Sequence, residues 1–192
     1  MTFSEFIASI YGQILVQLIG FFAMALGILS FQRKKRSAII GFQMSASVLW
    51  TTQFIFLGGY TGAMQNFIAI IRGAVLTQKG KYRWVSSYVT LGCIMLAFIA
   101  SGFITFRMEG ARTLIPIAAN LFQTVALYSD KEKTIRLLSL FVCPLWLIYD
   151  ILTGSIAGIF CECFGIASIV IALWRFRGAS KKSADDDVIK DQ

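Results

Sequence analysis

Two tryptophans and two polar residues are the side chains of this sequence best suited to bind a small molecule. Trp50 and Asn66 lie sixteen residues apart in the first half, and Trp146 and Glu162 repeat that spacing in the second half. Indole rings can stack on a solute, and an amide or a carboxylate can hydrogen-bond to its polar groups. All four lie in apolar stretches, where an ionisable residue usually marks function. The alternative is that Glu162 snorkels outward or only hydrogen-bonds in helix packing.

Three further polar residues follow the tryptophans closely and are candidates for a gate. Gln53 comes three residues after Trp50, and Tyr149 and Asp150 follow Trp146 in the same way. Hydrogen bonds between them could close the outer end of a path when the helices converge. The other interpretation is that Asp150 is simply solvated near the end of its helix.

Several kinds of chemistry are excluded by the residues present. The sequence has no histidine, so imidazole catalysis and His-ligated metal sites are absent. The four cysteines lie in apolar segments, and the pair Cys161 and Cys163 would point to opposite sides of a helix. No nucleophile accompanies the two carboxylates Asp150 and Glu162. We therefore expect no metal, no cofactor and no enzymatic activity.

The composition places these residues in a membrane. Of the 192 residues, 57% are hydrophobic and 15% are charged, against roughly 45 to 50% and about 25% in soluble domains. The net charge of +8 sits between apolar runs, which is typical of membrane topology and not of a nucleic-acid-binding face. The expected partners are therefore the lipid bilayer and a small polar solute, with no nucleic acid.

Seven apolar segments approach the roughly 20 residues that a helix needs to cross the hydrocarbon core. The loops between them alternate in charge, and 16 of the 18 Lys and Arg residues fall on one side. The positive-inside rule then predicts an N-terminus outside and a C-terminus in the cytoplasm. The segments are Ile7–Phe31, Ala38–Leu57, Thr61–Thr77, Trp84–Phe106, Thr113–Tyr128, Ile135–Leu152 and Ser155–Trp174.

An internal repeat groups these segments into two triplets. A shift of 96 residues aligns the pattern W-x7-G-x3-G at Trp50 to Gly62 with the same pattern at Trp146 to Gly158. Both triplets begin on the same side by charge, so one extra crossing must join them. We predict an all-α membrane protein of seven transmembrane helices, arranged as two parallel three-helix repeats joined by a linker helix. The divisions are 1–80, 81–108 (the linker), 109–177 and a disordered cytoplasmic tail at 178–192.

Other polar and small residues in the segments have simpler interpretations. We expect Arg72 to snorkel to the cytoplasmic interface. The amides and hydroxyls within the helices could line a path or bond across helix contacts, and we favour the second interpretation. These residues are Gln43, Ser45, Asn120 and Gln123. The glycines of the repeated pattern fit tight outer turns and close approach of helices.

Three stretches of sequence carry a resemblance to known families. GFFAMALGILSFQRKKR (Gly20 to Arg36), LWTTQF (Leu49 to Phe54) and RLLSLFVCPLWLIYDILTGSIAGIFCE (Arg136 to Glu162) are similar to the YgjV-type bacterial inner-membrane proteins. The Trp50 to Asn66 spacing and the WxxY at Trp146 to Tyr149 resemble the SWEET/PQ-loop superfamily. The first resemblance implies the bacterial inner membrane and leaves the function open.

The second resemblance implies a small-solute transporter or facilitator. In SWEET proteins a Trp and an Asn from each repeat line a central pocket, which here implies Trp50, Asn66 and Trp146. The fourth position holds Glu162, and the Pro-Gln motif of that family is replaced by Phe31-Gln32 and Leu127-Tyr128. The alternative is a non-transporting membrane receptor or accessory subunit on the same scaffold, because a fold alone does not fix a function.

Overall fold

The computed structural model describes residues 9–31, 36–129 and 132–171, and these residues form helices joined by short turns, with no β-strand among them. The apolar runs of the sequence form the long helices. Their order is α2 (Ile10–Phe31), α3 (Arg36–Leu57), α4 (Tyr60–Thr77), the 3-10 helix η1 (Arg83–Ser86), α5 (Tyr88–Glu109), the 3-10 helix η2 (Gly110–Thr113), α6 (Leu114–Tyr128), α7 (Glu132–Thr153) and a last helix, Ile156–Ile171.

Two of these stretches are long and apolar enough to cross a membrane, namely Ile10–Leu29 in α2 and the run Tyr88–Tyr128, which contains α5 and α6. Leu137–Thr153 and Ile156–Ile171 are shorter apolar helices. The predicted all-helical class is therefore confirmed for the described residues. The grouping of the helices into two parallel triplets stays a prediction, and the predicted tail at 178–192 lies outside the described residues.

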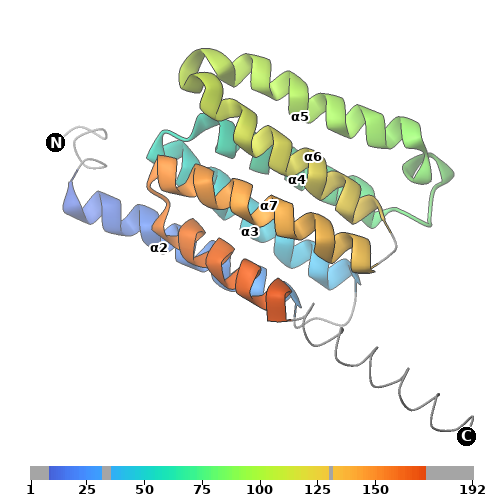
Figure 1. The fold of residues 1–192 in the computed structure, drawn as a ribbon, viewed down its shortest axis with the longest axis horizontal. Coiled ribbons are helices and arrows are strands. Elements are labelled where there is room, and N and C mark those ends of the chain that lie inside the picture. The colour runs from blue at the N-terminus through green and yellow to red at the C-terminus, as the bar shows by residue number, and fades with distance from the viewer. Residues whose placement is uncertain (1–8, 32–35, 130–131, 172–192) are drawn as a thin grey trace, which may run out of the picture.

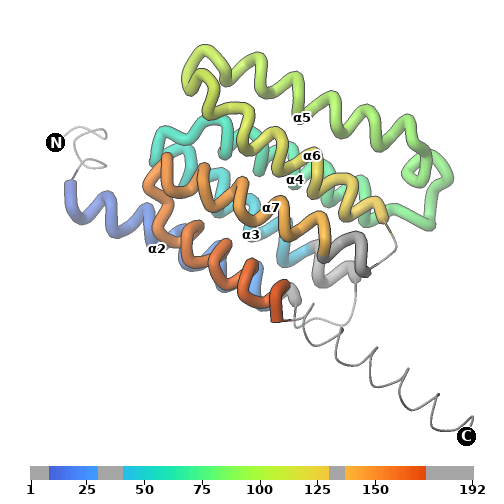
Figure 2. Tube along the Cα trace, in the orientation of Figure 1, coloured from blue at the N-terminus to red at the C-terminus, as the bar shows by residue number. Residues whose placement is uncertain are grey.

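The helices form two rows with α5 at one edge (Figure 1). One row contains α2, α3 and α4, which pack against each other in chain order, and the other contains α6, α7 and the last helix. The rows meet where α4 contacts α6 and where the rings of Phe54 on α3 and Trp146 on α7 lie 6.0 Å apart. Figure 2 follows the chain through the blue-to-cyan row, along the green α5 and back through the yellow-to-red row.

Among the described residues, the predicted helix boundaries agree with the structure to within a few residues, with one informative difference. The predicted ends at Ile7 and Trp174 lie outside the described residues. The linker segment was expected to begin at Trp84, but Trp84 lies in η1 and α5 begins at Tyr88. The side chain of Ser87 accepts a hydrogen bond from the Val89 N–H at 3.2 Å. A serine in this position satisfies one of the free N–H groups of a helix start, so the helix begins after it.

The turns that follow α3 and α7 have the same geometry. Gly58 and Gly154 adopt φ values of 74° and 73°, in the left-handed region that favours glycine. In the first turn the Gly59 N–H donates to the Phe54 carbonyl at 2.8 Å, and in the second the Ser155 N–H donates to the Asp150 carbonyl at 2.9 Å. The predicted role of these glycines in tight turns is confirmed. We call this end of the helices the turn end.

Candidate functional site

Four aromatic side chains form a cluster between α3 and α7, which we call the aromatic seam: Trp50, Phe54, Trp146 and Tyr149. Phe54 lies between the two tryptophans, with ring centroids 6.2 Å from Trp50 and 6.0 Å from Trp146. Tyr149 contacts Phe54 at 5.5 Å and the edge of Trp146 at 5.9 Å. Both tryptophans therefore pack against Phe54, a contact that the repeat did not predict.

Asn66 and Glu162 lie on the helices that flank this seam. Asn66 is partly exposed on α4, and its side-chain N–H donates to the Gly62 carbonyl of its own helix at 3.0 Å. Glu162 is partly exposed on the last helix. A shared solute site for Trp50, Asn66, Trp146 and Glu162 stays a prediction.

Tyr149 is held at the turn end by a network that connects three helices. The Gly62 N–H of α4 donates to the Tyr149 hydroxyl at 2.8 Å, and this hydroxyl donates to Glu109 Oε2 of α5 at 3.0 Å. The other oxygen, Glu109 Oε1, accepts from the Thr61 N–H at 2.5 Å. We call these four residues the Glu109 latch. It joins α4, α5 and α7 at one point.

The latch forms because the start of α4 lacks a cap of its own. Gly59, the residue before the helix, has no side chain with which to cap it, so the first N–H groups of α4 need other acceptors. A carboxylate is favoured at the positive end of a helix, and Glu109 supplies one from α5. The sequence interpretation missed Glu109. The signals available were a single acidic residue between Arg107 and Arg112 and a helix start without Ser, Thr, Asp or Asn before it.

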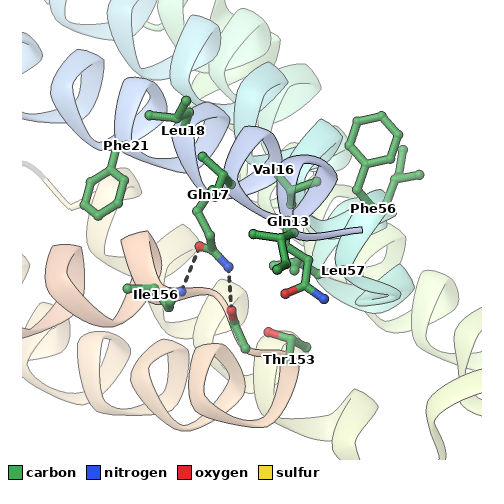
Figure 3. Close-up of a pocket in the computed structure, with 13 residues that line it drawn as sticks. Gln13, Val16, Gln17, Leu18, Phe21, Phe56, Leu57, Thr153 and Ile156 are labelled. Atoms are coloured by element: carbon green, nitrogen blue, oxygen red, sulfur yellow. Dashed lines mark hydrogen bonds between the residues drawn. The ribbon is translucent and has the colours of Figure 1, made fainter. Parts of the chain in front are cut away.

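Gln53, the residue that corresponds to Tyr149 in the repeat, bonds to a different set of partners. Its side-chain N–H donates to Gln17 Oε1 at 3.2 Å, and its carbonyl oxygen accepts from the Ser155 hydroxyl at 3.3 Å. Gln17 also accepts from the Ile156 N–H at 3.1 Å and donates to the Gly154 carbonyl at 2.8 Å (Figure 3). The Gln17 carboxamide therefore binds the start of the last helix, much as Glu109 binds the start of α4.

The gate candidates are all buried at the turn end. Gln53 and Tyr149 are 0% exposed and Asp150 is 3% exposed, so the interpretation of Asp150 as a solvated residue is wrong. Asp150 packs against Gly158, where an added Cβ would lie 2.3 Å from Asp150 Oδ1. Such close packing is possible only with glycine, as the repeated pattern predicted. The gating role of the three residues stays a prediction.

Arg72 does not snorkel to the interface as expected. Its side chain is only 8% exposed, and Nη1 donates to Asn120 Oδ1 at 3.2 Å and to Thr124 Oγ1 at 3.0 Å on α6. The guanidinium carbon lies 5.2 Å from the centre of the Phe98 ring on α5. The reason for the difference is that α6 offers polar acceptors within the helix contact. The expected bonding of Asn120 across a helix contact is confirmed. The same expectation is wrong for Ser45, whose hydroxyl donates to the Gly41 carbonyl of its own helix at 3.1 Å.

An open groove of about 980 Å³ lies on the outside of the helices, between α2, the end of α3 and the turn before the last helix. Figure 3 shows its mostly apolar wall, which includes Val16, Leu18 and Phe21, with Gln13 and Gln17 as the polar side chains of α2. None of the four predicted solute-binding residues lines it.

Two described stretches that are long and apolar enough to cross a membrane agree with the class of helical membrane proteins. A family model for Imp-YgjV, described as a bacterial inner membrane protein, matches residues 14–180. The chain therefore belongs to the Imp-YgjV family, which confirms the resemblance to YgjV-type proteins and a place in the bacterial inner membrane. No curated protein and no solved structure matches the chain.

Proposed function

We propose that this protein is a small-solute transporter or facilitator of SWEET-like architecture, with seven transmembrane helices in two parallel triplets and α5 as the linker. Contacts between the triplets support this arrangement. Gln17 of α2 accepts a hydrogen bond from the Ile156 N–H at the start of the last helix. Thr113 is the residue 96 positions after Gln17. Its hydroxyl lies 3.3 Å from the hydroxyl of Thr61 at the start of α4. Equivalent helices thus contact equivalent partners, as expected for repeats related by an axis along the membrane normal.

The observation that carries the proposal is a difference in exposure between the four predicted site residues and the side chains at the turn end. Trp50, Asn66, Trp146 and Glu162 each stay partly exposed, whereas Phe54 and Tyr149 at the turn end are 2% and 0% exposed. Transport by alternating access requires a site that is sealed at one end and reachable from the other. By the charge distribution of the loops, the sealed turn end faces outside and the C-terminus faces the cytoplasm.

The residues of the proposed site suggest the class of solute. The two indoles offer apolar faces for stacking, Asn66 offers both a donor and an acceptor, and Glu162 adds an acceptor that carries a negative charge when ionised. A polar solute that bears an amine or another cationic group fits this set. Neither a cofactor nor an enzymatic step is part of the proposal, and the partners are the lipid bilayer and the solute.

Binding of a solute should stabilise the purified protein, and this effect should depend on Asn66 and Glu162. We expect a screen of sugars, amines, nucleosides and vitamins in detergent to give a compound that raises the melting temperature, since a ligand at a hundred times its Kd adds about 2.7 kcal/mol to the folded state. Asn66→Ala should weaken this binding at least tenfold, and Glu162→Gln should weaken it most for cationic compounds.

The matched control is Gln13→Ala, which alters an exposed amide in the outer groove and should bind as the wild type does. Wild-type affinity in both Asn66→Ala and Glu162→Ala would rule out the proposed site.

A non-transporting receptor or accessory subunit is the second candidate, and one observation favours it. Phe54 fills the space between the two indoles, so a solute that stacks on both must displace its ring. If Phe54 stays in place, the seam is a packing core and the scaffold serves another protein. Binding of a solute without its passage across a sealed membrane would indicate this second function.

A further inference from the structure

Arg72 is a cation in the contact between α4, α5 and α6, and its described partners are neutral. They are Asn120 and Thr124 on α6 and the ring of Phe98 on α5. Nη1 bonds to both α6 side chains, and the Nε–H is buried without a hydrogen-bond partner. A guanidinium does not lose its proton in proteins, so this side chain cannot avoid its charge by becoming neutral.

No carboxylate of the described residues contacts Arg72. The acidic residue of α5, Glu109, is bound to the Thr61 N–H. Thr61 and Arg72 are eleven residues apart on α4, which corresponds to about 16 Å along the helix axis. Glu109 is therefore too far away to neutralise Arg72. A charge in a membrane segment is costly and is normally paired, and a buried charge without a partner destabilises a protein strongly.

We propose that Arg72 is the anchor of an oxyanion site at the junction of α4, α5 and α6, and that it binds a phosphate group, either from an anionic lipid or from free phosphate. The planar fork of a guanidinium matches the oxygens of a phosphate. The unpartnered Nε–H is a donor of this fork that the protein leaves unused.

The position of Arg72 suits a group that enters from the lipid headgroups. It lies five residues before Thr77, the last residue of α4, and so about 7.5 Å from the end of that helix. The same end carries Lys79, whose Nζ donates to the Tyr128 carbonyl of α6 at 2.8 Å, and beyond it Lys81 and Arg83. Basic pockets between transmembrane helices on the cytoplasmic side are typical binding sites for anionic lipid headgroups.

The experiment is a thermal unfolding titration of the delipidated full-length protein in detergent. Phosphatidylglycerol, phosphatidylcholine and inorganic phosphate are added separately, the last against sodium chloride at equal ionic strength. We expect phosphatidylglycerol to raise the melting temperature, phosphatidylcholine to have no effect, and Arg72→Gln to need at least tenfold more phosphatidylglycerol for the same rise. The control Arg107→Gln removes an exposed charge at the opposite, turn end of the helices and should respond as the wild type does.

The arms distinguish the sources of the phosphate group. A response to phosphatidylglycerol alone assigns the site to a lipid, and a response to inorganic phosphate at equal ionic strength assigns it to a free oxyanion. If Arg72→Gln does not fold, Arg72→Lys replaces it, because a point charge lacks the fork and should also bind at least tenfold more weakly. A wild type that responds to neither compound overturns the proposal, as does a folded Arg72 variant with the response of the wild type.

Discussion

Replacement of Glu109 by alanine is expected to lower the free energy of unfolding by about 3 kcal/mol, because it leaves the Thr61 N–H and the buried Tyr149 hydroxyl without their acceptor. A buried polar group that loses its partner costs about 1 to 3 kcal/mol, and bonds to a charged acceptor lie at the upper end. Glu109→Gln keeps one carbonyl oxygen and should lose roughly half as much. Unfolding in mixed detergent micelles, followed by circular dichroism, measures the difference.

The controls for this prediction are Arg107→Ala and Arg112→Ala. Both arginines are exposed next to Glu109, and such surface changes usually stay within about 0.5 kcal/mol. Tyr149→Phe completes a double-mutant cycle with Glu109→Ala, and the two changes should couple by about 1 kcal/mol or more, as residues in one network do. If Glu109→Ala unfolds like the arginine controls, the latch does not hold the turn end together.

The second large effect concerns the glycines that allow the helices to approach each other. An added Cβ at Gly62 would lie 2.6 Å from Tyr149 Cε1, and one at Gly158 would lie 2.3 Å from Asp150 Oδ1. Gly62→Ala and Gly158→Ala should therefore each lower the free energy of unfolding by about 2 kcal/mol, within the usual range for overpacking. Thermal unfolding of the single variants in detergent measures this loss.

Gly92 provides a control with the opposite sign. It lies inside α5, and a Cβ at this position would meet nothing within 4 Å. Gly92→Ala should stabilise the protein by about 0.5 to 1 kcal/mol, because alanine is the better helix former. If alanine has the same effect on stability at Gly62, Gly158 and Gly92, helix propensity alone explains the three changes. The close packing of Gly62 and Gly158 against α7 would then be wrong.

The two halves of the protein use the same backbone geometry for different chemistry. Phe54 packs against Gly62 in the first half, and Asp150, which is 96 positions later, packs against Gly158 in the second. In the same way Gln53 corresponds to Tyr149, and the two bond to different partners. The turn end is therefore closed by an amide network on one side and by the Glu109 latch on the other.

The sequence alone predicts the features that depend on local pattern. The length of the apolar runs predicts the helices, and the repeated W-x7-G-x3-G pattern predicts both glycine turns. These signals are strong because each of them repeats or extends over many residues. Phe54 between the indoles could not be predicted, since its counterpart in the repeat is Asp150 and no symmetry argument points to it.

The polar contacts between distant helices are the part that sequence reasoning could not supply. Glu109 bonds to residues 48 and 40 positions away, and Arg72 bonds to α6 across 48 positions. A single charged residue in an apolar helix has several ways to satisfy its charge, and snorkelling is one of them. Only the packing of α4 against α5 and α6 decides among these ways, and it directs Arg72 inward.

Passage of a solute across sealed liposomes tests the proposed transport most directly. Liposomes containing only the purified protein are loaded with a mixture of sugars, amines, nucleosides and vitamins, and the compounds that leave are identified by mass spectrometry. We expect at least one polar compound to escape faster than from protein-free liposomes, and Asn66→Ala to slow its escape at least tenfold. A compound that binds the protein through Asn66 but stays inside the liposomes would contradict transport and favour the receptor function.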